Sequence, residues 1–219
     1  MTPSFGLIHI QFLLQGALWT IVLSLCAFVG GGLMGLLIAL CRVSRQPWLR
    51  SLAAGYIQMI QGIPLLVIMF VGYFGLPAIG VPVSPLWAAT LSMTVWVGAY
   101  LGEFWRGSIQ AVPQAQWEAA ECLGLSSAQR MFKVIIPQAV RIATPGTVGF
   151  MVQIIKNTSL ASAVSFVDLT RAGQLINNST FQPFITFSFV ALIYFLLCYP
   201  LSALSRRLEL RMARGVRSA

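Results

Sequence analysis

Five long apolar runs, separated by shorter polar segments, dominate the pattern of this 219-residue chain. A helix that crosses the hydrocarbon core of a bilayer needs about 20 mainly apolar residues. The runs predict such helices over residues 14–41, 52–76, 86–105, 142–167 and 184–204. We therefore expect an all-α membrane protein that forms a single transmembrane domain over residues 1–219.

Glycine and proline add local detail to this pattern. Gly75 and Gly80, with three prolines between residues 77 and 85, mark a turn between the second and third spans. Gly30-Gly31-Gly32 and Gly35 lie inside the first span. Small residues let membrane helices approach closely, so we expect tight helix packing there.

Composition agrees with a lipid environment. Hydrophobic residues make up 58% of the chain and charged residues only 9%, whereas soluble domains carry about 25% charged residues. The net charge of +9 does not indicate nucleic-acid binding, because such proteins cluster their basic residues on a water-facing surface. Here the basic residues lie between apolar runs.

The basic residues are distributed unevenly between the two sides of the predicted spans. One side holds only Arg171, and Lys156 lies within a span. Because cytoplasmic segments are enriched in Lys and Arg, the bias predicts an outside N-terminus and a cytoplasmic C-terminus, and this orientation needs an odd number of spans. The cytoplasmic side holds the other twelve: Arg42, Arg45, Arg50, Arg106, Arg130, Lys133, Arg141, Arg206, Arg207, Arg211, Arg214 and Arg217.

Catalytic chemistry has few candidate residues. The carboxylates are Glu103, Glu118, Glu121, Asp168 and Glu209, and they form no evident acid and base pair. His9 is the sole histidine, and the four cysteines form no CxxC pair, so the sequence indicates neither a metal site nor a disulfide framework. The chain has no GxxxxGK[ST] segment, so we expect neither a membrane-embedded enzyme nor an ATPase, and no cofactor in this chain. The tryptophans Trp19, Trp87, Trp96 and Trp105 are interpreted as membrane-interface or packing residues.

The cytoplasmic segment 106–141 carries strong helix signals. Pro113 suits a helix start, Gln114, Glu118 and Glu121 then share one face, and Gly124 supplies a stop. Ser126 to Gln129 fits a capping box that opens a second short helix, which we expect to end near Pro137. From the residues alone, this helix-turn-helix is equally compatible with a docking surface and with a scaffold that has no partner.

A known family carries the same residues at the same spacing. Glu118-Ala119-Ala120, Gly124 and Val134-Ile135-Ile136-Pro137 resemble the EAA loop of binding-protein-dependent ABC importers. Gln61-Gly62-Ile63-Pro64-Leu65-Leu66 resembles the RGTPLL segment of polar amino acid permeases, and Lys156-Asn157-Thr158-Ser159-Leu160 resembles their K-[DN]-[TS]-S-L segment. Gln61 and Ile63 depart from the usual Arg and Thr.

This resemblance implies the fold of a type I ABC importer permease in a bacterial inner membrane. It implies a coupling helix whose contact with an ATPase uses Glu118, Ala119, Ala120, Gly124 and Pro137. The implied partners are a second permease subunit, identical or closely related, two ABC ATPase subunits that hold ATP and Mg, and a periplasmic or tethered substrate-binding protein. Such a protein would approach the outer loop that contains Asp168, Arg171, Asn177 and Asn178.

Lys156 is the main candidate for a substrate-path residue. A charge near the bilayer centre costs about 2.5–3.5 kcal/mol or more, so a compensating role is expected. We predict a helix break at Asn157-Thr158-Ser159 and a path lined by Lys156, Asn157, Thr158, Gln58 and Gln61. The alternatives are that Lys156 lies nearer an interface, or that it pairs with Glu103 or Asp168.

The cargo is the least determined property. A cationic Lys156 could attract the carboxylate of any amino acid, and the preference is for glutamate or aspartate. An ion-gradient-driven secondary transporter is the alternative function class, but such folds often contain inverted repeats, and none is visible in the chain.

Overall fold

The protein is helical throughout the part of the chain that the structure describes. The structure is a computed structural model that describes residues 5–217, with side chains described as far as Met212, and no strand occurs in this range. The side chains of Arg214 and Arg217, which enter the charge count, lie outside the described residues. The principal helices are α1 (Leu7–Arg42), α2 (Pro47–Gln61), α3 (Leu65–Phe70), α4 (Leu76–Ala78), α5 (Pro85–Gln110), α6 (Gln114–Cys122), α7 (Ser127–Gln129), α8 (Ile136–Asn157), α9 (Leu169–Thr180) and α10 (Pro183–Arg217).

The α1–α5 pair forms the centre of the bundle. Both helices run in the same direction, because Gly31 meets Val97 and Gly35 meets Gly102. A Cβ added at Gly31 would lie 2.4 Å from Val97 Cγ1, so only glycine permits this approach. The close packing predicted for the glycines of the first span is confirmed.

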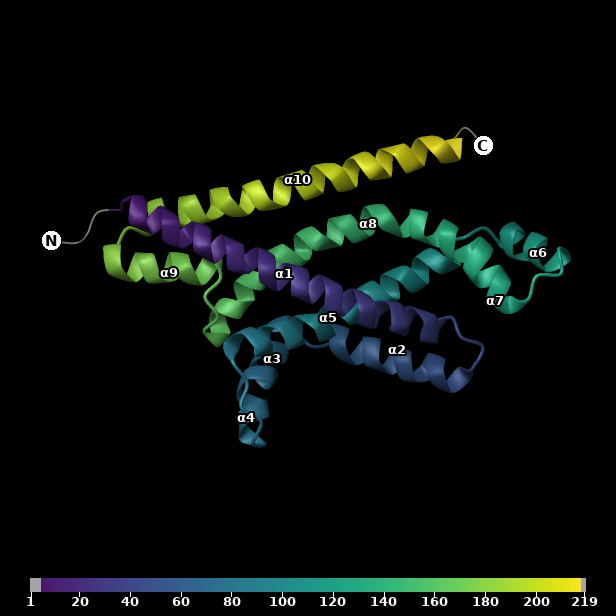
Figure 1. The fold of residues 1–219 in the computed structure, drawn as a ribbon, viewed down its shortest axis with the longest axis horizontal. Helices are drawn as coiled ribbons and strands as arrows, with labels where there is room; N and C mark the ends of the chain where they lie inside the picture. Colours follow the sequence, from purple (N-terminus) through teal and green to yellow (C-terminus); the bar gives the residue numbers. More distant parts are fainter. Residues whose placement is uncertain (1–4, 218–219) are drawn as a thin grey trace.

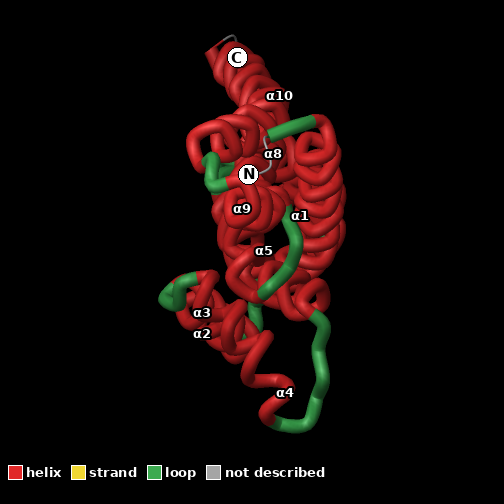
Figure 2. Tube along the Cα trace, turned by 90° about the vertical axis from the view of Figure 1, so that its left-hand side faces the viewer, coloured by secondary structure: helices red, strands yellow, loops and turns green. Residues whose placement is uncertain are grey.

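The predicted second span, 52–76, is not one helix. α2 ends at Gln61, α3 begins at Leu65, and the two halves are bent by 97°. Pro64 explains the break, because proline disfavours a helical conformation in the residue before it. α3 and α4 consequently turn away from the bundle axis (Figures 1 and 2).

The predicted cytoplasmic segment 106–141 is shorter than expected at both ends. α5 continues to Gln110, and a continuous helical rod begins at Ser127. The rod consists of α7, the π-helical turn Arg130–Ile135 (η2) and α8, and it runs without interruption to Asn157. The expected helix end near Pro137 is wrong. A π turn shifts the hydrogen-bond partners to five residues apart, which accommodates a proline that has no N–H to donate.

A second π turn has the same relation to a proline. Val71–Gly75 (η1) comes just before Leu76 and Pro77, as η2 comes just before Ile136 and Pro137. In both places the helix widens and continues through the proline. α4 ends at Ala78, and the turn predicted between the second and third spans follows at residues 79–84, where Gly80 has φ +86°.

The helix break predicted at Asn157-Thr158-Ser159 is wrong, because the helix narrows there but does not split. After Asn157 the chain continues as the 3-10 helix Thr158–Val164 (η3), and Ser165 then adopts a left-handed conformation with φ 64°. The segment predicted as an outer loop contains the helix α9. Asp168 caps α9, and its carboxylate accepts hydrogen bonds from the backbone N–H groups of Thr170 and Arg171 at 3.2 and 2.9 Å.

Two described helices are long and apolar enough to cross a membrane, namely α1 and α10 as far as Met212. The bent pairs α2–α4 and Ser127–Thr180 would add one span each. α5 is not in this group. It packs against α1, α2, α3 and α8, so much of its surface is covered by protein and needs less apolar character. The five passes stay a prediction.

Candidate coupling helix and substrate path

α6 presents a small exposed surface at one end of the molecule (Figure 1). Glu118 and Ala119 are exposed, whereas Ala120 is buried, with 2% of its surface accessible. The helix stops as the sequence predicts. Gly124 has φ +70°, and the Leu125 N–H donates to Ala120 O at 3.2 Å, which is the usual closure of a helix by a left-handed glycine.

Several contacts attach α6 to the rod. Ser126 Oγ accepts from Gln129 N–H at 3.3 Å and Gln129 Oε1 accepts from Ser126 N–H at 3.1 Å, so the predicted capping box is confirmed. Arg130 lies 3.0 Å from Glu121. Gln138 on α8 donates to Gln116 on α6 at 3.2 Å. The Arg130–Glu121 ion pair and the Gln138–Gln116 hydrogen bond therefore bridge the turn between α6 and the rod.

Pro137 lies on the rod and not on α6. It is exposed in the first turn of α8, while buried Ile135 and Ala139 on either side pack into an apolar cluster with Ile109 and Val112. Of the predicted coupling residues, Glu118, Ala119 and Gly124 are exposed on or next to α6. Ala120 lies on the buried face of the same helix.

Lys156 lies one residue before the end of α8 and is exposed on the isolated chain. It borders a polar cavity of about 340 Å³ between α8 and α10, together with Gln153, Ser202 and Glu209. Gln153 Nε2 donates to Asn157 Oδ1 at 3.3 Å. Lys156, Gln153 and Asn157 therefore lie at the same end of α8.

The other predicted path residues lie elsewhere. Gln58 and Gln61 are exposed on α2, and neither borders the Lys156 cavity. Thr158 is fully buried, and its hydroxyl donates to Ile155 O at 2.8 Å. Within one chain, only Lys156 and Asn157 of the predicted set come together.

The proposed internal partners of Lys156 are engaged with other groups. Glu103 forms an ion pair with Arg106 on its own helix, and its second oxygen lies 3.5 Å from Arg42 Nε on α1. Asp168 caps α9 and accepts from Tyr194 Oη at 3.2 Å. Lys156 forms no ion pair among the residues whose side chains are described.

A second cavity beside α8 is lined by aromatic residues that the sequence did not single out. Tyr100, Phe104 and Phe150, with Gly146, Gly149 and Gln153, line a cavity of about 420 Å³ between α5 and α8. Gly149 and Gln153 also border the Lys156 cavity. The spacing Gly146, Gly149, Gln153 places one small and polar stripe on α8, and this spacing was the signal available in the sequence.

The long apolar helices define a helical membrane protein, with the short exposed helix α6 at one end of the bundle. The family described as binding-protein-dependent transport system inner membrane component matches residues 31–214. The chain belongs to this family of ABC transporter permeases. It is not an enzyme, and ATP hydrolysis lies on a separate subunit.

Named relatives cover nearly the whole chain. The probable amino-acid ABC transporter permease protein YckA of Bacillus subtilis (strain 168) is 35% identical over 205 residues, which cover 94% of this chain and 91% of the relative. The probable glutamine ABC transporter permease protein GlnM of the same organism is 34% identical, with 92% and 94% covered.

Solved structures show the same fold. A crystal structure of an amino acid ABC transporter with histidines has a TM-score of 0.89 and 33% identity, and the match covers 96% of this chain and 100% of that chain. An inward-facing MetNI methionine ABC transporter has a TM-score of 0.77 at 16% identity, over 93% and 99% of the two chains. This second likeness concerns the fold alone.

Proposed function

We propose that the chain is the permease subunit of an ATP-driven importer that carries a polar amino acid across a bacterial inner membrane. The names of the relatives support an amino acid as cargo. We further propose five passes with the N-terminus outside. The α1–α2 turn, the segment that follows α7 and the C-terminal part of α10 lie at one end (Figure 1) and support this orientation, because Arg42, Arg45, Arg50, Arg130, Lys133 and the arginines from Arg206 to Arg211 lie in or next to them.

The attachment of α6 to the rod is the observation that carries the mechanism. An ATPase subunit would contact Glu118, Ala119 and the turn at Gly124, which are exposed. The bonds from Gln138 and Arg130 to α6 then make α8 follow any displacement of α6. ATP and Mg bind the partner ATPase in this scheme, and ATP binding draws two copies of α6 together.

The assembly has two permease subunits, identical or closely related, two ATPase subunits and a substrate-binding protein. Movement of α8 alternately opens the polar stripe beside Lys156 to the two sides of the membrane. Lys156 meets the carboxylate of the cargo, and Gln153 and Asn157 offer hydrogen bonds. Glutamate and aspartate are the expected cargo because each brings a second carboxylate to a cationic site.

Uptake into proteoliposomes tests the path. The permease is reconstituted with its ATPase and binding protein, and uptake of labelled glutamate, aspartate and glutamine is compared with and without ATP. We expect Lys156→Met to abolish most ATP-dependent uptake and Lys156→Arg to retain a larger part of it. Normal uptake by a correctly assembled Lys156→Met complex would refute the role of Lys156 in the substrate path. A preference for glutamine would refute glutamate and aspartate as the cargo.

Copurification tests the coupling surface separately. Glu118→Arg should weaken the retention of the ATPase subunit, while the nearly isosteric Glu118→Gln shows how much of the effect is electrostatic. Uptake that persists without the ATPase and follows an ion gradient would favour a secondary transporter and would overturn the proposal.

A further inference from the structure

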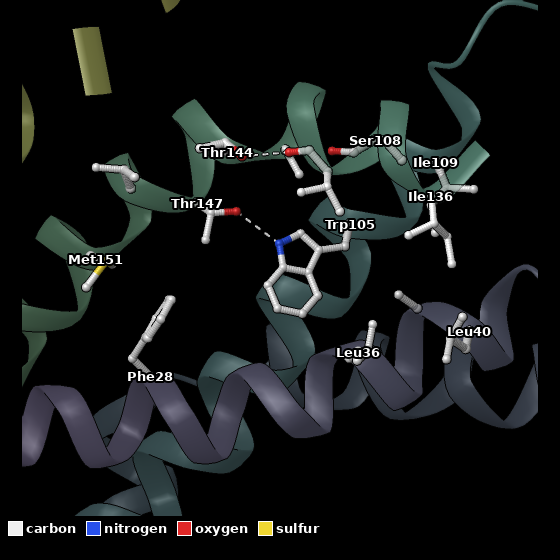
Figure 3. Close-up of a pocket in the computed structure, with 15 residues that line it drawn as sticks. Phe28, Leu36, Leu40, Trp105, Ser108, Ile109, Ile136, Thr144, Thr147 and Met151 are labelled. Atoms are coloured by element: carbon white, nitrogen blue, oxygen red, sulfur yellow. Dashed lines mark hydrogen bonds between the residues drawn. The ribbon is translucent and has the colours of Figure 1, made fainter. Parts of the chain in front are cut away.

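An apolar cleft separates α1 from α8, and Trp105 of α5 stands between the two helices (Figure 3). Its volume is about 360 Å³. An apolar cavity of about 150 Å³ already stays dry and holds a six-carbon ring. The cleft is therefore large enough for an extended apolar group, and its walls include Phe28, Leu36, Leu40, Ile136, Val140 and Met151.

The polar side chains of the cleft already have partners within the protein. Trp105 Nε1 donates to Thr147 Oγ1 at 3.0 Å. Thr144 Oγ1 donates to Val140 O at 2.7 Å, and Ser108 Oγ donates to Phe104 O at 3.0 Å. The donor groups of Trp105, Thr144 and Ser108 are thus engaged within the protein and offer little to a polar ligand, so the chemistry of the cleft favours an apolar occupant.

The cleft opens sideways, toward the space that a bilayer would fill. Leu36 and Val140 on its rim are 47% and 56% exposed. From Phe28 to Leu40, α1 advances about 18 Å at about 1.5 Å per residue, a little more than half of a hydrocarbon core of about 30 Å. The cleft thus has the depth of one leaflet.

Three basic residues lie close in the sequence to the lining residues Leu40, Ile136 and Val140. Arg45 follows the end of α1, Lys133 lies one turn before Ile136, and Arg141 follows Val140. All three are exposed and form no ion pair among the described side chains. Basic groups beside a gap between membrane helices suit an anionic lipid headgroup.

We propose that this cleft binds one acyl chain of an anionic phospholipid, with the phosphate at the end marked by Arg45, Lys133 and Arg141. The volume, the satisfied polar groups, the sideways opening and the charge at one end all fit this occupant. The proposal rests on α1 and α8 lying in the bilayer, as in the proposed function, and it does not depend on the cargo or on Lys156.

Quenching of Trp105 fluorescence by lipid tests the site directly. The permease–ATPase complex is placed in nanodiscs with phosphatidylglycerol or phosphatidylcholine brominated on one acyl chain, and the signal lost in Trp105→Phe isolates the Trp105 contribution. We expect stronger quenching by the anionic lipid. Arg141→Gln should lower the relative affinity for that lipid about fivefold, while Arg50→Gln on α2 should leave it unchanged.

A substitution that fills the cleft provides a second test of the proposal. Ala143 lines the cleft on α8, whereas Ala191 is exposed on α10. Ala143→Leu should remove most of the lipid quenching of Trp105, and Ala191→Leu should not. If Ala143→Leu fails to assemble, the headgroup comparison in the unchanged cleft still decides the question.

Other occupants predict other results. Quenching by aqueous acrylamide in place of brominated lipid would mean a water-filled cleft, and quenching by neither would mean that a protein helix, such as one from a second subunit, covers it. Equal quenching by the two lipids that survives Ala143→Leu would mean ordinary lipid contact. Each of these overturns the proposal. ATP-dependent uptake that continues after the lipid site is lost leaves the proposed function standing. Failure of the lipid proposal can therefore be distinguished from failure of the proposed function.

Discussion

Replacement of Gly124 isolates the contribution of the backbone at the end of α6, the proposed coupling helix. Gly124 has φ +70°, and a Cβ added there meets no atom within 4 Å. Gly124→Ala therefore introduces no clash, and its cost is that of a non-glycine residue in the left-handed region, about 1–2 kcal/mol. That free energy corresponds to about a 5–30-fold change in an equilibrium. The strain favours a relaxed turn in the free permease, whereas the ATPase subunit would contact the closed turn, so we expect the affinity of the permease for its ATPase subunit to fall by up to a factor of this size.

The assay is a titration of the ATPase subunit onto nanodisc-embedded permease. Gly124→Asn is the decisive comparison, because asparagine visits the left-handed region routinely. The Gly124→Asn permease should bind the ATPase subunit nearly as well as the unchanged chain does. Gly55→Ala on α2 is a control in open space at ordinary helical dihedrals. Normal binding by Gly124→Ala, or binding by Gly124→Asn as weak as that of Gly124→Ala, would contradict this expectation.

Two further substitutions probe the bundle. Gly31→Ala places a Cβ 2.4 Å from Val97 Cγ1 and should lower the unfolding free energy by about 1–3 kcal/mol, measured by thermal unfolding in detergent, and Val97→Ala in the same chain should recover part of the loss. Asp168→Ala removes the cap of α9 and the hydrogen bond from Tyr194 at 3.2 Å. The local stability of α9 should fall by about 1–2 kcal/mol, and its backbone hydrogen exchange should accelerate accordingly. Asp168→Asn keeps a capping oxygen and should be milder. Unchanged exchange in Asp168→Ala would show that the cap is dispensable.

Local signals in the sequence predicted the coupling region well. Gly124 and the pair Ser126 and Gln129 act through bonds to residues only a few positions away, so their effect depends little on the rest of the fold. Pro137 was misinterpreted for a related reason. A proline excludes one hydrogen bond of a regular α-helix, but a wider turn avoids that bond, and packing of Ile135 and Ala139 favours continuation.

Longer-range features could not be obtained in this way. Pro64 indicates a break between α2 and α3, but the 97° angle depends on where α3 packs against α5 and η3. The grouping of Gln58 and Gln61 with Lys156 assumed that polar residues of neighbouring spans face one another. In one chain they do not, because α2 packs against α1 and α5 and lies away from the α8–α10 cavity.

The uninterrupted rod from Ser127 to Asn157 has a consequence for how fast and how completely a displacement could pass along it. About 45 Å of helix, at about 1.5 Å per residue, extends from Ser127, close to α6, to the neighbourhood of Lys156 with no loop between them. A stiff arm transmits displacement without waiting for a loop to order. The rod departs from a regular α-helix at the wide turn Arg130–Ile135 and at Pro145, so a softer rod at either place would let the ATPase hydrolyse ATP while the end near Lys156 stays in place.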